Sequence, residues 1–146
     1  MAEKMPQTLA NHAKLVPGFH GVAFVLALIY LVWAVMRLFG NLSFDTIAPF
    51  ALALSFLLVA FYVRTFANQN QDRIIRLEER LRMRELLPDD LQGRIGDFTT
   101  NQLIALRFAS DGELPDLARK VLDEGIDDRK AIKGLVQHWR PDYERV

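Results

Sequence analysis

The fold of this chain is decided by two apolar stretches, FHGVAFVLALIYLVWAVM from Phe19 to Met36 and IAPFALALSFLLVAFYV from Ile47 to Val63. A helix of about 20 residues crosses the hydrocarbon core of a bilayer, and each stretch is close to that length. The remaining polar sequence of the 146-residue chain is too short to surround two helices that are apolar on every face. The sequence therefore predicts an integral membrane protein with two transmembrane helices, at about residues 19–39 and 46–65.

The two predicted spans form a transmembrane helical hairpin, residues 19–66, with both chain ends in the cytoplasm. The connection between them is short and contains Gly40-Asn41, which is a turn signal. Six arginines follow the second span, whereas Arg37 is the only one beside the connection. Because cytoplasmic loops carry the excess of arginine and lysine, the C-terminal part and the N-terminal tail, residues 1–18, are expected in the cytoplasm.

The second span is predicted to continue as a long helix that protrudes from the membrane over residues 67–87. No glycine occurs between Thr46 and Leu87, and the only proline in this range, Pro49, lies near its start. Glycine and proline are the residues that most readily interrupt a helix. A single helix is therefore expected to link the membrane to the cytoplasmic part.

An apolar stripe runs along the protruding helix, since Ile74, Leu77 and Leu81 share one face at helical spacing. Three interpretations stay open: the stripe packs on the chain's own C-terminal helices, it pairs with a second copy as a short coiled coil, or it lies on the lipid surface. In the third interpretation, lipid headgroups are contacted by basic side chains of the same region, Arg64, Arg73, Arg76, Arg80 and Arg84.

Residues 88–146 predict a small cytoplasmic bundle of three or four short helices. Pro88 ends the long helix, and Thr99 with Gln102 forms a capping-box pattern at the start of an apolar helix. An amphipathic helix follows over residues 113–124, and a last helix is expected over residues 128–139, with Asp127 as its cap. No segment has the pattern of a strand, so the predicted fold class is all-α.

Motifs for chemistry are missing from the sequence. There is no cysteine, which excludes disulfides, iron–sulfur clusters and thiolate zinc sites. The three histidines lie far apart, and the spacings of zinc sites, phosphate loops and nucleophile elbows do not occur. Of these histidines His20 lies in an apolar stretch, near its cytoplasmic end, where an interfacial role is expected. We therefore expect no catalytic residue, cofactor or metal, no small-molecule substrate, and a protein that is not an enzyme.

Nucleic-acid binding is also not expected. Residues 88–146 carry nine basic and twelve acidic side chains, whereas affinity for phosphate requires clustered cations. The net charge of the whole chain is zero. Membrane lipid and other protein chains remain as the expected partners.

Three motifs resemble those of an uncharacterised family of small bacterial two-span inner-membrane proteins. They are QDRIIRLEERLR from Gln71, QLIALRFASD from Gln102 with Glu113-Leu114-Pro115, and DRKAIK from Asp128 with WRPDY ending at Tyr143. The resemblance implies a multi-pass protein of the bacterial inner (plasma) membrane and implies no activity. Some members carry permease-like labels, which two spans without polar membrane residues do not support.

Several residues of these motifs are not required by core packing and form a candidate partner surface: Arg107, Lys130, Lys133, Arg140, Asp142 and Tyr143. The alternative is that they form ordinary salt bridges and a tail docked on the domain. The sequence thus predicts a non-catalytic, membrane-anchored helical adaptor or accessory subunit that binds another copy or a larger membrane complex. A second hypothesis is a component of an oligomeric membrane transporter or permease.

Overall fold

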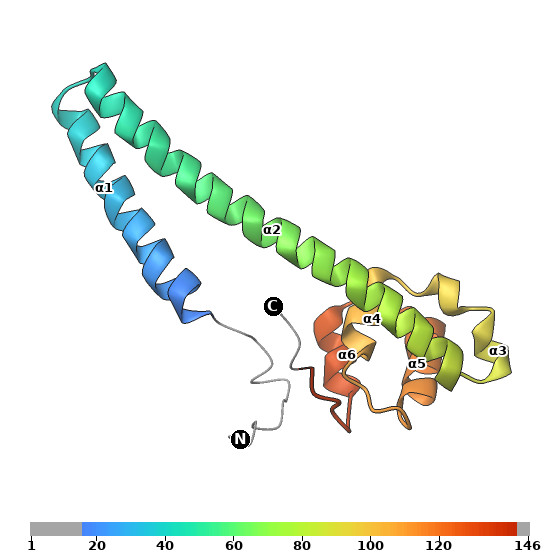
Figure 1. The fold of residues 1–146 in the computed structure, drawn as a ribbon. Helices are drawn as coiled ribbons and strands as arrows, with labels where there is room; N and C mark the ends of the chain where they lie inside the picture. The colour runs from blue at the N-terminus through green and yellow to red at the C-terminus, as the bar shows by residue number, and fades with distance from the viewer. Residues whose placement is uncertain (1–15, 143–146) are drawn as a thin grey trace. The chain divides into compact units, whose positions relative to one another are not determined.

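The computed structural model describes residues 16–142, apart from the side chain of His20, and these residues form helices and connecting segments with no strand. The elements in chain order are η1 (Pro17–Ala23), α1 (Phe24–Gly40), α2 (Phe44–Leu86), α3 (Asp89–Gln92), η2 (Ile95–Asp97), α4 (Thr100–Leu106), α5 (Leu114–Asp123) and α6 (Arg129–Leu135) (Figure 1). The all-α prediction is confirmed. The described residues divide into two compact units, which we call the apolar unit (residues 16–68) and the helical domain (residues 69–142).

The apolar unit contains η1, α1 and the first part of α2. Two helical stretches, Pro17–Gly40 and Phe44–Leu86, are long and apolar enough to cross a membrane by length and composition. Most of their large apolar side chains are exposed, while the small side chains of Ala34 and Ala53 are buried. A groove of about 560 Å³ lies between α1 and α2 and is lined almost entirely by apolar side chains.

The turn between α1 and α2 is closed by Thr46, which is buried. Its hydroxyl donates to the carbonyls of Asn41 (2.7 Å) and Ser43 (2.9 Å) and accepts the N–H of Ser43 (3.0 Å). Buried polar groups of a helix start need such partners. A short connection is thus present at residues 41–43, directly after Gly40, the last residue of α1, and α2 begins at Phe44, slightly before the predicted start of the second span.

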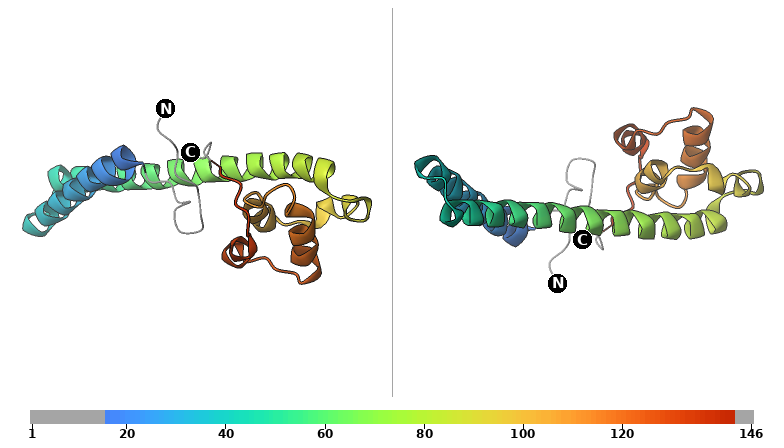
Figure 2. Two further views of the ribbon diagram at one scale, coloured as in Figure 1. Left: turned by 90° about the horizontal axis from the view of Figure 1, so that it is seen from below. Right: turned by 90° about the horizontal axis from the view of Figure 1, so that it is seen from above.

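Helix α2 is unbroken over 43 residues, which confirms the prediction of one long helix. Its last part belongs to the helical domain, and Figure 2 shows the short helices lying along one side of it. Ile75, Glu79 and Met83 face them at i, i+4 spacing and are buried. Residues 69–87 are therefore part of the domain's structure, because Met83 and Leu87 contribute to its core.

The core of the helical domain is built from one apolar face of each helix. In α5 the buried residues are Leu114, Leu117, Ala118 and Val121, as the amphipathic pattern predicts. Around them pack Leu103 and Leu106 of α4 and Ile132 of α6, together with the last residues of α2. The side chains of Leu106, Leu114 and Ile132 have no exposed surface.

The capping box of α4 is confirmed. The Thr99 hydroxyl accepts from the N–H of Gln102 (3.2 Å), and the Gln102 carboxamide accepts from the N–H of Thr99 (2.9 Å). Gln102 also donates to the carbonyl of Ile126 (2.9 Å). Gly125 adopts φ +63° at the end of α5, which is the left-handed conformation expected after a helix.

The predicted start of the last helix is wrong by one residue. The N-cap of α6 is Asp128, whose carboxylate accepts from the N–H of Ala131 (2.6 Å). Asp127 instead accepts hydrogen bonds from the side chains of Thr99 and Asn101. These bonds, that from Thr99 first, lower the pKa of the Asp127 carboxyl below its usual value.

The predicted end of the last helix is also wrong, because α6 stops at Leu135 and not at Trp139. The N–H groups of Gln137 and His138 donate to the carboxylate of Glu113 (2.7 and 3.0 Å). Further along, Trp139 forms an isolated antiparallel bridge with Ala109. Hydrogen bonds to distant residues therefore replace the helical ones and lead the chain into an extended C-terminal segment.

Candidate functional site

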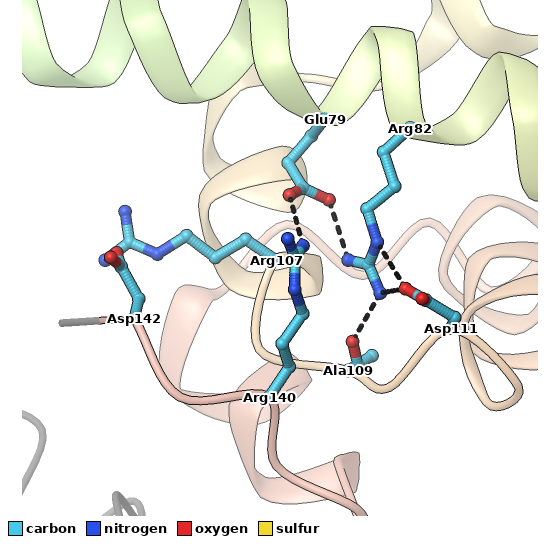
Figure 3. Close-up of polar contacts among 7 residues, drawn as sticks. All are labelled: Glu79, Arg82, Arg107, Ala109, Asp111, Arg140 and Asp142. Atoms are coloured by element: carbon cyan, nitrogen blue, oxygen red, sulfur yellow. Dashed lines mark hydrogen bonds and ion pairs between the residues drawn. The ribbon is translucent and has the colours of Figure 1, made fainter. Parts of the chain in front are cut away.

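The polar centre of the helical domain is Glu79, whose residue is only 4% exposed. It lies on the face of α2 that packs on the domain, one turn from Ile75 and one turn from Met83. A carboxylate at such a position must find charged or hydrogen-bonding partners. Figure 3 shows that these partners come from α2 itself, from the end of α4 and from the C-terminal segment.

Arg82 joins α2 to the loop between α4 and α5. Its guanidinium donates to Glu79 (3.1 Å), to Asp111 through Nε (2.9 Å) and to the carbonyl of Ala109 through Nη2 (2.7 Å). The Arg82 side chain is only 10% exposed. Charge-assisted hydrogen bonds with several partners are stronger than neutral ones, so Arg82 fixes this loop on the long helix.

The C-terminal segment is held on the same site by two ion pairs. Arg140 approaches Glu79 with Nη1 at 3.6 Å from Oε1, and Arg107 pairs with Asp142 at 3.4 Å. The ring of Trp139 lies 4.8 Å from that of Phe108, measured between centroids. Residues 139–142 are thus attached to the domain by charge and by aromatic packing. We call Glu79, Arg82, Arg107, Asp111, Arg140 and Asp142 the arginine–carboxylate cluster (Figure 3).

Burial dominates the protonation of Glu79. Removal from water raises the pKa of its carboxyl above the usual 4.5, and the neighbouring charges of Arg82, Arg140 and Arg107 oppose this effect without overcoming it. For Asp90 at the domain surface, the partner outweighs burial: the hydrogen bond from Arg119 (2.5 Å) lowers the pKa of the Asp90 carboxyl. The cluster therefore has one buried proton-binding group, Glu79, at its centre, while Arg140 and Asp111 at its edge are more than half exposed.

The raised pKa of Glu79 predicts a stability difference that depends on pH. The folded protein binds this proton more tightly than the unfolded chain, so the linked stability is fully present below pH 4.5 and is lost as pH rises through the raised pKa. A Glu79→Gln variant lacks this titration. The free energy of unfolding of the wild-type chain minus that of Glu79→Gln is expected to increase as pH is lowered from neutrality towards 4.5. Urea unfolding at each pH measures it, and a constant or decreasing difference would contradict the assignment.

The cluster lines a groove of about 680 Å³ between α2 and the C-terminal segment. Its lining is mixed, with Leu81 and Pro141 as apolar groups and Glu85 as an acidic one. Within residues 16–142, no group of three or more His, Cys, Asp or Glu side chains is arranged to hold a metal ion. The arrangement can therefore hold a peptide segment by charge and apolar contact, as it holds the protein's own residues 139–142.

The structure divides the residues of the predicted partner surface. Arg107 is only 7% exposed, so its place on an exposed surface is a wrong prediction; the buried side chain stabilises the C-terminal segment instead. Arg140 and Asp142 form ion pairs of the kind proposed in the alternative interpretation. Lys133 lies over the Phe108 ring (4.9 Å) and Lys130 is exposed. Tyr143 lies outside the described residues.

The interpretation that Ile74, Leu77 and Leu81 pack on the chain's own C-terminal helices is wrong. These side chains stay exposed, Leu77 by 63%. The reason is rotational: the domain occupies the face of α2 that carries Ile75, Glu79 and Met83. The stripe lies away from that face, and only Leu81 reaches the edge of the groove. Pairing with a second copy and contact with lipid both stay predictions.

The predicted headgroup contacts also differ in exposure. Arg73, Arg76 and Arg84 are exposed, whereas Arg64 and Arg80 are partly buried. Within residues 16–142, none of these five arginines has an ion pair within 4.0 Å. Their contact with lipid stays a prediction.

Sequence reasoning missed Glu79, Arg82 and Asp111 as site residues. One signal was available for Glu79, since it stands between the apolar residues Ile75 and Met83 at i, i+4 spacing. A carboxylate at this position on a face that packs indicates a buried charge with distant partners. Those partners could not be assigned from spacing, because Asp111 and Arg140 come from other elements.

Comparison with known proteins gives one match. The model of a family of unknown function (DUF6526) matches residues 1–146, the whole chain. Neither a curated protein nor a solved structure matches it.

Proposed function

The chain belongs to the family of unknown function DUF6526, which supplies no activity. We propose from its residues that the protein is a membrane-anchored helical adaptor or accessory subunit. The apolar unit serves as a two-span anchor in a bacterial inner membrane, with both chain ends in the cytoplasm. The helical domain presents a non-catalytic binding surface to another protein.

One observation carries this proposal: a single helix, α2, belongs to both units. Its first part exposes large apolar side chains such as Phe56 and Phe61 to their surroundings, which is favourable in lipid and costly in water. Its last part buries Met83 and Leu87 in the core of the domain. The same unbroken helix thus connects a lipid-compatible surface to a packed polar domain.

The proposed binding surface consists of those residues of the predicted partner surface that are exposed. Lys130 on α6 is exposed, and the Arg140 side chain is 52% exposed at the edge of the groove. The mixture of charge and apolar groups around this groove suits a protein segment better than a small apolar ligand. The alternative of a transporter has less support, because the groove between α1 and α2 offers almost no polar lining for a solute.

The anchor and its orientation are tested by cysteine labelling, for which the chain is suited because it contains no cysteine. Leu42→Cys places a thiol in the turn between α1 and α2, and Lys130→Cys places one on the domain; both positions are exposed. In intact spheroplasts a membrane-impermeant maleimide is expected to label only Leu42→Cys. Lysis should then expose Lys130→Cys.

The opposite labelling pattern would reverse the proposed topology. Full release of the protein into the soluble fraction would contradict the anchor altogether. The parent chain without cysteine is the matched control for background labelling.

A further inference from the structure

The outer face of α2 in the helical domain carries an apolar stripe that the protein's own described residues leave uncovered. Ile74, Leu77 and Leu81 are each more than half exposed. Figure 2 shows the short helices along one side only of this part of α2. The stripe therefore needs a partner that approaches from the other side.

The stripe has the spacing of a coiled-coil seam. With Ile74 at position a of a heptad, Leu77 falls at d and Leu81 at the next a. Glu79 then falls at position f, which faces away from a coiled-coil partner, and Glu79 is the residue that the domain buries. Helix α2 can thus bind a partner helix along the seam while the domain packs on its opposite face.

The flanks of the stripe carry opposite charges. Arg73 and Arg80 occupy the two g positions, and Glu78 and Glu85 occupy the two e positions. Within residues 16–142 none of these four side chains has an ion pair within 4.0 Å. One flank of the stripe is therefore basic, with Arg80 partly buried, and the other flank is acidic and borders the groove.

We propose that a second copy of this chain covers the stripe as a parallel two-stranded coiled coil over residues 73–85. In a parallel pair, each g residue faces the e residue five positions later on the other helix. Arg73 then meets Glu78 of the second copy, Arg80 meets Glu85, and the two-fold symmetry repeats both pairs. An antiparallel pair would set Arg against Arg and Glu against Glu.

The charge pattern also separates a second copy from a lipid surface. An anionic surface attracts Arg73 and Arg80 but repels Glu78 and Glu85, which border the same stripe. A second copy satisfies all four residues. The parallel orientation also rests on the proposed function as a membrane anchor. Copies inserted into the membrane in one direction present their long helices in the same direction.

The seam is short, since Asn70 and Arg84 occupy the d positions before and after its three apolar residues. A coiled coil of this length is marginal for free helices in water. Anchoring in one membrane raises the effective concentration of the two copies. The pairing is therefore expected in the full-length protein in its membrane.

The test is oxidative cross-linking of single-cysteine variants in membranes. Leu77→Cys lies at d, where two copies approach closely, and Arg76→Cys is the matched control at the outward c position; both residues are exposed. Leu77→Cys is expected to yield at least about tenfold more disulfide-linked dimer, because only close pairs of Cα atoms can be bridged. Equal yields from the two variants, or a Leu77→Cys cross-link to a different protein, would overturn the proposal.

Charge exchange tests the register and orientation. In the Leu77→Cys background, an acidic copy carries Arg73→Glu and Arg80→Glu, and a basic copy carries Glu78→Arg and Glu85→Arg. Each copy alone is expected to lose about tenfold in cross-linking, since four favourable pairs become repulsive. Co-expression of both copies should restore a cross-link between them. Wild-type yields from either copy alone, or no recovery on co-expression, would overturn the paired arrangement.

Membrane fractionation of the same samples separates this inference from the proposed function. Protein that stays in the membrane without a Leu77→Cys cross-link overturns the coiled coil and leaves the anchor in place. Protein found in the soluble fraction overturns the anchor, while a Leu77→Cys cross-link in that fraction would still support the pairing.

Discussion

Replacement of Ile132 by aspartate is expected to unfold the helical domain. The Ile132 side chain has no exposed surface and packs in the core with Leu106 and Leu114. An unpaired carboxylate in such a core costs several kcal/mol, which is a large part of the 5–15 kcal/mol that stabilises an ordinary domain. In the full-length chain, limited proteolysis should therefore cut the Ile132→Asp domain rapidly and leave the wild-type domain resistant.

The matched control for this variant is the next residue along the chain. Ala131→Asp introduces the same charge at an exposed position in the first turn of α6, where an acidic side chain is favourable, so wild-type resistance is expected. Leu114→Asp, which is equally buried, should behave like Ile132→Asp. Unchanged resistance of both buried variants would refute the packing of α5 and α6 described above.

Removal of the Glu79 carboxylate is expected to produce the second largest effect. Glu79→Ala leaves Arg82, whose side chain is only 10% exposed, with Asp111 but without its buried carboxylate partner, and it removes the anchor of Arg140. Breaking one partner of a buried ion pair is strongly destabilising. Because the Arg140 side chain is half exposed and can turn to water, the free energy of unfolding is expected to fall by about 3 kcal/mol, the lower end of the range for buried ion pairs.

Two measurements follow the Glu79→Ala variant. The urea midpoint reports the loss of stability, with Glu124→Ala as the matched control at an exposed position outside the cluster. The fluorescence of Trp139 reports release of the C-terminal segment, provided that Trp33, the chain's second tryptophan, is replaced by Phe. Identical midpoints and emission spectra for Glu79→Ala and Glu124→Ala would show that the cluster does not hold residues 139–142.

Local features of the fold could be predicted from the sequence because their causes are local. The length of α2 follows from the lack of glycine and late proline, and the capping box at Thr99 follows from a pattern of four residues. The buried face of α5 follows from the spacing of its apolar residues. Each of these depends on neighbours within one or two helical turns.

The docking face of α2 could not be predicted in this way. Hydrophobic spacing favours the stripe at Ile74, Leu77 and Leu81, but the domain packs on the face that includes the carboxylate of Glu79. That face is stabilised by Arg82, which is close in sequence, and by Arg140, which is not. The early end of α6 has a similar cause, because Glu113 on a different element accepts the N–H groups that follow it. Partners distant in sequence decide both features.

The two faces of α2 have different partners. The inner face, around Glu79, holds the protein's own domain, and the outer face, around Leu77, is proposed to hold a second copy. Lys130 and the Arg140 edge of the groove remain accessible in the described structure for a different protein. The proposal is therefore an anchored dimer that carries two copies of a binding domain.

The most direct test of the adaptor proposal is the native mass of the full-length protein, extracted by mild detergent from its own membrane, with all co-purifying chains identified. A discrete complex that contains at least one other protein is expected. The Ile132→Asp variant should remain in the membrane fraction and lose that protein, whereas Ala131→Asp should keep it. A complex made only of copies of this chain, or a partner that Ile132→Asp retains fully, would contradict the adaptor role; the first of these results would favour the oligomeric transporter.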